Sequence, residues 1–222
     1  MSPDGWFSRV GRGRSGMIPC RNHEPRQGVA VSHGRLDRLR SIAREGHQVS
    51  AVRRAIFYLF YDSQGIVDDY VPHMLGSLRP HAEHIFVVSN SRLTPASRTK
   101  LESVADTVFV RENVGFDVWG YKQALEAFGR EKLAEYDEII LMNYTVFGPV
   151  YPFSEMFDRV EALDVDFWGV TSHAKVDPNP YGTPGFPFLP EHIQSHWIAV
   201  RNRLFTSLEF EEYWDTMPMI TS

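Results

Sequence analysis

The chain is poor in cysteine and has no long apolar run. Among its 222 residues Cys20 is the one cysteine, so no intrachain disulfide can form. A single thiol also cannot supply the ligands of a thiolate zinc site. No run approaches the ~18 apolar residues that cross a bilayer, and the first residues lack the apolar core of a secretory signal. These absences favour a soluble, globular protein of a reducing compartment.

Three signatures of common enzyme classes are also missing. There is no G-x-G-x-x-G motif, so a dinucleotide-binding Rossmann domain has no support. A P-loop lysine motif and a G-x-S-x-G elbow are absent too, which disfavours NTPases and α/β-hydrolases. The nine histidines do not form a metal-binding spacing, so no metal ligands are predicted among them.

Charge is distributed unevenly along the chain. Residues 1–50 contain nine arginines, no lysine and four acidic residues, a balance of +5, which leaves −10 for the rest of a chain whose total is −5. An acidic body disfavours a broad nucleic-acid surface. Residues 1–50 are interpreted as a disordered basic leader. A basic arm that contacts anionic lipid or a partner, and a transit peptide, are the alternatives.

Residues 51–222 carry a regular apolar pattern. The predicted strands cover 53–62, 84–91, 107–112, 137–143 and 166–173. The predicted helices cover 66–78, 95–105, 117–130 and 152–163. Pro72 is the main objection to the first helix, and Asp117 is the expected N-cap of the third. Strand–helix alternation with short connections predicts an α/β fold, a mainly parallel sheet with helices on both faces.

The pattern changes after residue 173. Residues 174–190 contain five prolines and predict a long loop, of a kind that is often functional. A further strand over 192–200 and a helix over 203–215 follow. Because no clear cap closes that helix, a domain truncated at its carboxyl end stays an open alternative.

Four ordered motifs resemble the rhamnan synthesis F family. They are RENVGFD (111–117), YDEIILMN (136–143) with a later Gly-Pro pair, DFWGVT (166–171) and HIQSHW (192–197). Members of that family are regarded as glycosyltransferase-like proteins that build rhamnose-containing cell-surface polysaccharides. The resemblance covers about residues 54–216. It implies a GT-A-like glycosyltransferase domain over 51–222.

The resemblance also implies roles for individual residues in loops that follow the strands. It assigns nucleotide-sugar donor binding to Asp62, Arg111, Asn113, Gly115, Asp117, Asn143 and Thr145. It assigns the acceptor side of the site to Trp168, Thr171, Gln194 and Ser195.

A divalent metal, Mg²⁺ or Mn²⁺, is the cofactor that the resemblance implies. Such an ion takes hard oxygen ligands and bridges the donor diphosphate, which requires carboxylates at the end of the strand. This chain has Asn143, Tyr144 and Thr145 there, with Tyr144 in place of an expected carboxylate. Metal dependence is therefore left open.

Glycosyl transfer makes two chemical demands. The leaving diphosphate needs a positive partner, for which Arg111 is the candidate, although a surface ion pair is an equally ordinary use of that side chain. An inverting enzyme also needs a base for the acceptor hydroxyl. Asp166, Glu191 and His192 are the candidate catalytic residues, with ordinary polar strand ends as the alternative interpretation.

The sequence therefore predicts a glycosyltransferase that moves a sugar, rhamnose or another deoxyhexose, from a nucleotide-sugar donor to a cell-surface polysaccharide. The alternative is a non-catalytic member that binds a nucleotide sugar or glycan, or that scaffolds a polysaccharide assembly complex. Expected partners are the donor and a glycan or lipid-linked glycan acceptor, and no nucleic acid. The expected location is the cytoplasm, or a peripheral position at the inner face of the plasma membrane.

Overall fold

The computed structural model describes residues 15–17, 52–181 and 187–219. Apart from residues 15–17, the expected leader over 1–50 lies outside the described residues. So do residues 182–186 of the predicted loop. The boundary between leader and domain therefore stays a prediction.

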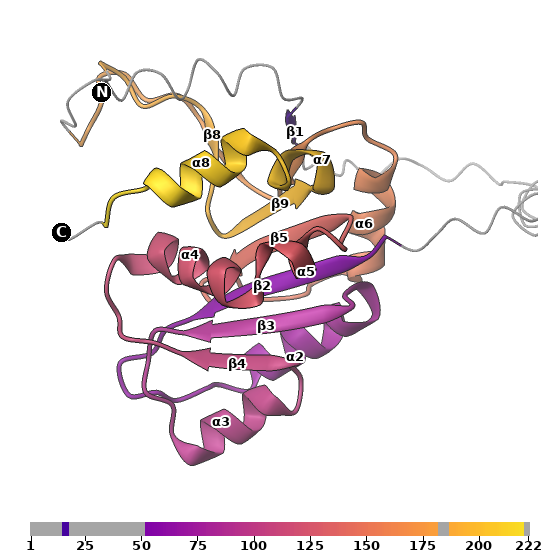
Figure 1. Ribbon diagram of the computed structural model, residues 1–222, viewed down its shortest axis with the longest axis vertical. Coiled ribbons are helices and arrows are strands. Elements are labelled where there is room, and N and C mark those ends of the chain that lie inside the picture. Colours follow the sequence, from indigo (N-terminus) through magenta and orange to yellow (C-terminus); the bar gives the residue numbers. More distant parts are fainter. Residues whose placement is uncertain (1–14, 18–51, 182–186, 220–222) are drawn as a thin grey trace, which may run out of the picture. The chain divides into compact units, whose positions relative to one another are not determined.

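A sheet of seven strands forms the centre of the described fold, in the order β1-β6-β9-β5-β2-β3-β4. Every neighbouring pair is parallel except those that involve β9, which runs antiparallel to β5 and β6 (Figure 1). The strands are β1 Ser15–Met17, β2 Arg54–Phe60, β3 His84–Ser89, β4 Thr107–Val110, β5 Glu138–Asn143, β6 Phe167–Gly169 and β9 Trp197–Arg201. The predicted mainly parallel sheet is confirmed.

Helices cover both faces of this sheet, as the alternating pattern predicts (Figure 1). One face carries α2 Tyr70–Leu78, α3 Pro95–Glu102 and α6 Phe153–Glu161, with the short 3-10 helix η3 Arg79–His81 after α2. The other face carries α4 Phe116–Phe128, α5 Arg130–Leu133, α7 Asn202–Phe205 and α8 Leu208–Thr216. The α/β fold class predicted from the sequence is therefore found.

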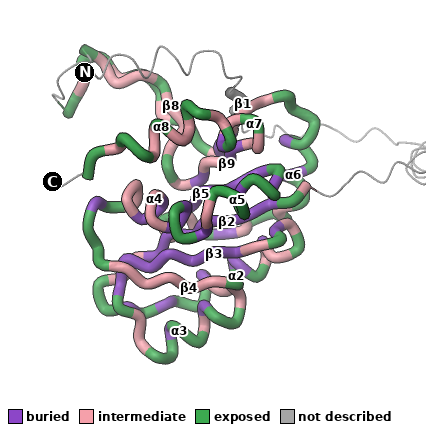
Figure 2. The backbone as a smooth tube through the Cα atoms, in the orientation of Figure 1, coloured by how far each residue is buried: buried purple, intermediate pink, exposed green. Residues whose placement is uncertain are grey.

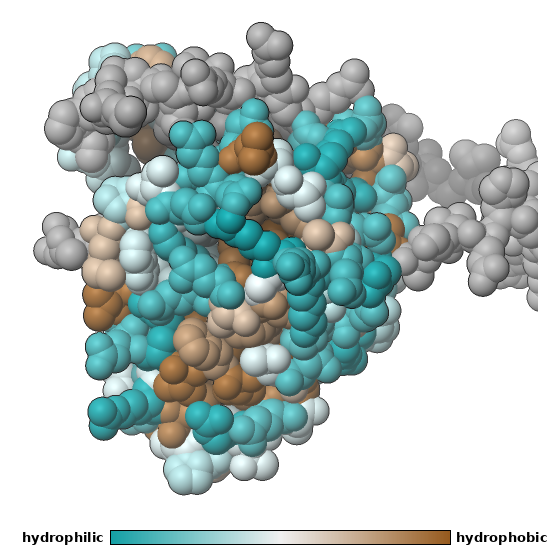
Figure 3. Space-filling view, viewed as in Figure 1, coloured by the Kyte–Doolittle hydropathy of each residue, from teal (hydrophilic) through white to brown (hydrophobic). Residues whose placement is uncertain are grey.

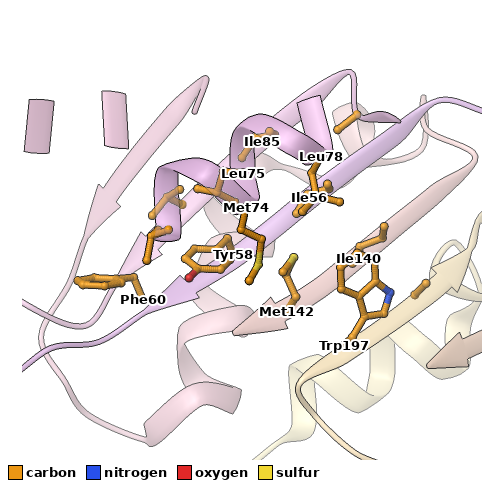
Figure 4. Packing of buried hydrophobic residues seen from close by; sticks show 14 of the residues in the cluster. Ile56, Tyr58, Phe60, Met74, Leu75, Leu78, Ile85, Ile140, Met142 and Trp197 are labelled. Atoms are coloured by element: carbon orange, nitrogen blue, oxygen red, sulfur yellow. The ribbon is translucent and has the colours of Figure 1, made fainter. Parts of the chain in front are cut away.

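Strand β2 shows why the sheet is buried on both sides. Its residues point alternately to the two faces, as the strand period of two requires. Ile56 and Tyr58 pack against Met74 and Leu75 of α2 on one face (Figure 4). Phe57 belongs to the cluster on the other face, where it packs against Phe128 of α4 with ring centroids 5.3 Å apart. Figure 2 shows the central strands buried and the outer helix surfaces exposed.

The edge strand β4 is less covered than the centre. All four of its residues are half-buried. Figure 3 shows an apolar area over the β3–β4 part of the viewed face, beside the polar surface of the helices.

The first predicted helix begins later than the sequence indicates. Helix α2 starts at Tyr70, so residues 66–69 are not helical. This later start places Pro72 within the first turn, where a missing N–H leaves no intrahelical bond unmade.

Two predicted strands are each divided. The segment 166–173 forms β6 and then β7 (Ser172–His173), and 192–200 forms β8 (His192–Ile193) and then β9. β7 and β8 pair with each other as a separate antiparallel hairpin. The reason lies at Gly169, where a Cβ would sit 2.1 Å from Cγ2 of Ile193. The side chain of Ile193 packs against Gly169, which has no Cβ, and the chain leaves the main sheet at this point.

The last predicted helix, over 203–215, is also divided into α7 and α8. Ser207 starts a new helix, because its hydroxyl accepts a hydrogen bond from the backbone N–H of Phe210 at 3.2 Å.

A buried charge cluster lies at the edge of the sheet where β2 and β5 begin and the antiparallel β9 ends. Glu138 is fully buried and pairs with Arg54 at 2.8 Å and with Arg201 at 2.9 Å. Its carboxylate also accepts a hydrogen bond from the indole N–H of Trp168 at 2.7 Å. The cluster therefore ties β2, β5, β6 and β9 together, at the edge opposite the candidate site.

Candidate functional site

The carboxyl-terminal ends of the parallel strands gather polar side chains at one edge of the sheet. β2, β3, β4 and β5 all end there, and β9 begins there because it runs the opposite way. We call this the carboxyl edge. Its polar residues include Asn90 after β3, Arg111 after β4, Asn143 at the end of β5 and His196 before β9. Ligands of open α/β sheets bind at such an edge.

Arg111 holds the loop between β4 and α4. Its guanidinium donates to Asn90 Oδ1 at 2.7 Å, to Gln123 Oε1 at 2.5 Å and to the backbone oxygen of Val114 at 2.5 Å. Asn90 in turn donates to Oδ1 of Asn113 at 3.2 Å. We call these hydrogen bonds around Arg111 the Arg111 web. They fix the loop from both ends and bring the predicted donor-binding residues Arg111 and Asn113 together.

Arg111 is also a positive charge with neutral hydrogen-bond partners. Within the described ranges no carboxylate lies within ion-pair distance of its guanidinium, in contrast to Arg54 at the opposite edge. Burial lowers the pKa of Arg111, although a guanidinium stays protonated in proteins. A partly buried cation without a counter-charge favours an anionic ligand.

Gly115 sets the start of α4. It adopts φ +74°, and a Cβ there would sit 2.5 Å from the Cβ of Trp119. The N-cap of α4 is therefore Gly115, which corrects the expectation that Asp117 fills that position. Asp117 instead lies in the first turn, where its side chain is free to contact another strand.

Four side chains form a polar relay across the carboxyl edge. Asn143 Nδ2 donates to Asp117 Oδ2 at 3.0 Å, and Asn143 Oδ1 accepts from the Thr145 hydroxyl at 2.5 Å and from its backbone N–H at 3.2 Å. The Thr145 hydroxyl lies 3.0 Å from Nδ1 of His196. The structure thus brings together Asp117, Asn143 and Thr145, which the resemblance assigns to donor binding, and adds His196.

Tyr144 stands in the middle of this edge. Its ring packs on Tyr61 and Phe60 with centroids 6.4 and 6.0 Å apart, and its backbone oxygen accepts from the Tyr70 hydroxyl at 3.1 Å. Burial raises the pKa of its phenol, and the carboxylate of Asp117 adds to this. Tyr144 is therefore a neutral phenol at neutral pH.

Asp62 follows β2 at the same edge, where its carboxylate closes a turn. Oδ1 accepts from the backbone N–H groups of Gln64 and Ile66, both at 2.9 Å. Its own N–H donates to the Ser91 hydroxyl at 2.8 Å. Its assigned role near the nucleotide stays a prediction.

Three of the four expected acceptor-side residues, Thr171, Gln194 and Ser195, lie around the base of the β7–β8 hairpin. The backbone N–H of Gln194 donates to the oxygen of Thr171 at 3.1 Å, and Ser195 follows in the exposed turn before β9. His192 stacks on His173 with ring centroids 5.3 Å apart, and its Nδ1 lies 2.8 Å from the oxygen of Pro190. Glu191 is exposed beside it.

The structure does not bring Asp166 and Trp168 to this edge. Asp166 precedes β6 at the amino-terminal edge, where it pairs with Arg203. Trp168 is fully buried and donates to Glu138. A cavity of about 340 Å³, bounded by Asp137 and Arg201, also lies at that opposite edge. It is separate from the polar relay.

The carboxyl edge does not have the donor set of a magnesium or manganese site. The oxygen of Asn143 already accepts two hydrogen bonds from Thr145, and Asp117 is the one carboxylate in the relay. Among the described residues no group of three or more His, Cys, Asp or Glu side chains is placed to hold a metal ion. Because such ions require several hard oxygen ligands, the residues at the end of β5 do not fit one.

Sequence reasoning missed three residues of the site. Asn90 and Gln123 lie outside the motifs, and their link to Arg111 depends on the pairing of β3 with β4 and on the rotation of α4. His196 lies inside the HIQSHW motif, and the split between β8 and β9 places it next to Thr145.

Comparisons with known proteins give one family and several distant structures. A family model described as Rhamnan synthesis protein F matches residues 85–222. The uncharacterized protein y4gN of Sinorhizobium fredii is 22% identical over 196 residues, which cover 87% of this chain and 47% of that protein. The chain thus spans about half the length of this curated relative.

Two solved structures illustrate the structural similarity. Glucosyl-3-phosphoglycerate synthase from Mycobacterium tuberculosis, in complex with Mn²⁺ and UDP-glucose, is 11% identical, with a TM-score of 0.41 over 88% of this chain and 66% of that one. Core-mannan synthase A from Aspergillus fumigatus, in a Mn/GDP form, is 8% identical, with a TM-score of 0.34 over 78% of this chain and 66% of that one.

None of the helices within the described residues combines the length and the apolar character that a bilayer crossing requires.

Proposed function

Because the chain belongs to the rhamnan synthesis protein F family, we propose that it is a glycosyltransferase that uses a nucleotide-sugar donor. The observation that carries this proposal is the convergence of the Arg111 web and the polar relay on the carboxyl edge. These two networks join loops from four strands, in the place where an α/β sheet binds its ligand.

Each network supplies what a nucleotide sugar requires. The diphosphate carries negative charge, and Arg111 offers a guanidinium without a carboxylate partner in the described part of the chain. The sugar carries hydroxyls, and the relay offers carboxylate and hydroxyl groups to bind them. Exposed aromatic rings follow the relay in the loop after β5, where Phe147 is 75% and Tyr151 73% exposed. Such rings suit the apolar faces of sugar rings.

The proposal extends to the substrate class. The donor is a nucleotide-linked deoxyhexose such as rhamnose, and the acceptor is a cell-surface polysaccharide or its lipid-linked precursor. Family membership supports this choice. On the same grounds, the reaction takes place in the cytoplasm or at the inner face of the plasma membrane.

A direct test is binding of dTDP-, UDP- and GDP-sugars by isothermal titration calorimetry, with and without Mn²⁺. The proposal expects one donor to bind saturably and its nucleoside diphosphate to be released on incubation. Arg111→Gln should weaken binding of the nucleoside diphosphate, while Arg159→Gln, on the exposed side of α6, should not. Failure of every donor to bind would refute the proposal.

One observation favours a second candidate function. The end of β5 offers an amide, a phenol and a hydroxyl in place of carboxylates. A member that binds a nucleotide sugar or glycan without turning it over, as a scaffold of a polysaccharide assembly complex, agrees with that donor set. Donor binding without release of nucleoside diphosphate would identify this function.

A further inference from the structure

The hydrogen-bond partners in the polar relay fix where each proton lies. A carboxylate only accepts, so the amide nitrogen of Asn143 faces Asp117 and the amide oxygen faces Thr145. The Thr145 hydroxyl has one proton, which it donates to Asn143 Oδ1. Its contact with His196 Nδ1, at 3.0 Å, is therefore one in which Nδ1–H donates and the hydroxyl accepts. The neutral imidazole of His196 thus has its lone pair at Nε2.

The relay runs in one direction, from the imidazole of His196 to the carboxylate of Asp117. Every bond donates toward Asp117, from Nδ1–H to Thr145, from Thr145 to Asn143 and from Asn143 to the carboxylate. A chain of hydrogen bonds that ends on a negative charge is polarised along its length. The backbone also holds the residue in place, because the N–H of Asn143 donates to the backbone oxygen of His196 at 3.3 Å.

The other candidate bases are less well placed. Asp166 lies at the opposite edge of the sheet and pairs with Arg203. The ring of His192 stacks on His173, and its Nδ1 contacts the backbone oxygen of Pro190, which is not a relay residue. Glu191 is exposed on the hairpin, and no hydrogen bond within the described residues orients its carboxylate toward the relay.

On the basis of the proposed function, we infer that His196 is the general base of the transfer and that Thr145, Asn143 and Asp117 position it. The acceptor hydroxyl gives its proton to the lone pair of Nε2 while its oxygen forms the new bond to the anomeric carbon. The bond from that carbon to the diphosphate breaks, and its electron pair leaves with the nucleoside diphosphate. The imidazolium then returns the proton to water. The Nδ1–H of His196 stays hydrogen-bonded to the Thr145 hydroxyl throughout, and no divalent ion takes part.

The test uses the donor identified by binding, with water as the acceptor. The rate at which nucleoside diphosphate is released at saturating donor gives kcat. Calorimetry gives the Kd of the donor for each variant. His196→Gln should lower kcat about 100-fold or more, the range of general-base catalysis, and leave the donor Kd unchanged. Thr145→Val, which removes the hydroxyl at nearly constant volume, should also lower kcat. His73→Gln, an exposed histidine on α2, is the matched control and should change neither value.

The outcomes separate this role from the proposed function. If wild-type protein binds no donor, the proposed function fails and the role of His196 fails with it. If it binds a donor but does not turn it over, the protein has the non-catalytic function, and the role of His196 fails together with the transferase. If the wild-type protein turns the donor over and His196→Gln keeps its kcat, the inference about His196 alone is overturned. A weaker donor Kd with unchanged kcat would likewise overturn it, because His196 would then contact the diphosphate.

A second readout does not depend on activity. Nitrogen-15 NMR of the imidazole distinguishes the two neutral tautomers. The relay predicts the Nδ1–H tautomer for His196 in the wild-type protein. In Thr145→Val this tautomer should no longer be preferred over the Nε2–H tautomer. An Nε2–H tautomer in the wild-type protein would contradict the proton arrangement on which the inference stands.

Discussion

Single residues decide the geometry of the carboxyl edge, and Asp117 is the clearest case. Its carboxylate fixes the orientation of the Asn143 amide, and through it the rest of the relay. The sequence alone marks Asp117 as important through the RENVGFD motif, yet it suggests a helix cap. The positive φ of Gly115, which moves the cap two residues earlier, is a backbone property that a motif does not reveal.

Asp117→Ala should weaken donor binding by about 10- to 100-fold, because it removes a carboxylate that the proposed function assigns to the sugar hydroxyls and that orients Asn143. Calorimetry with the donor measures the change, and a circular dichroism melt checks folding. Asp158→Ala, on the exposed side of α6, is the control. An unchanged donor affinity in a folded Asp117→Ala protein would remove Asp117 from the site.

Gly115→Ala should destabilise the protein by more than the ~1–2 kcal/mol that a left-handed backbone costs an alanine. Gly115 adopts φ +74° and ψ +18°, and its new Cβ would also meet the side chain of Trp119. Urea denaturation of the variant and the wild-type protein measures the loss of stability. A loss of ~1 kcal/mol or less would mean that the contact with Trp119 relaxes without cost.

At the scale of elements, the sequence predicts most strands and helices but not how the later ones divide. The central strands are continuous apolar runs, which predict the burial on both faces that the structure shows. The segments 166–173 and 192–200 look equally continuous, yet each is split by packing of Ile193 over Gly169. The antiparallel direction of β9 follows from this hairpin, which returns the chain to the carboxyl edge. Because that contact joins residues 24 positions apart, local periodicity could not reveal it.

The buried charge cluster is the main polar contact between these elements. Glu138→Ala should destabilise the fold by about 3–5 kcal/mol, because it leaves Arg54 and Arg201 without their buried partner. Glu161→Ala is the matched control, since Glu161 is 35% exposed and Arg54 keeps Glu138 when it is lost. Chemical denaturation measures both. A loss below ~1 kcal/mol for Glu138→Ala would show that the cluster relaxes or admits water.

At the scale of the whole molecule, the α/β class and the helix-covered sheet were predictable, whereas the site was predictable only in part. The motif residues Asn143 and Thr145 lie at and just after the end of β5, and their assigned roles stay predictions. Their partners Asn90, Gln123 and His196 come from three separate regions of the chain. Strand order brings these regions together, and a single sequence gives strand order only by general rules.

Removal of residues 1–50 should leave the sheet folded. Of this segment the structure describes β1, which contacts β6 through three residue pairs. The midpoint of thermal unfolding should therefore fall by less than ~4 °C, the equivalent of about 1 kcal/mol for a domain of this size. Differential scanning calorimetry of the shortened and full chains checks this. A much larger decrease would show that the segment is part of the folded unit.

The central claim is that the carboxyl edge binds a nucleotide sugar, and one measurement tests it most directly. Purified wild-type protein and Asp117→Ala are titrated by calorimetry with dTDP-, UDP- and GDP-sugars in EDTA and then in Mn²⁺. The account predicts saturable binding of one donor to the wild-type protein, with equal affinity in EDTA and Mn²⁺, and an affinity about 10- to 100-fold weaker in Asp117→Ala. Absence of binding for every donor, or binding that Asp117→Ala leaves unchanged, would contradict it.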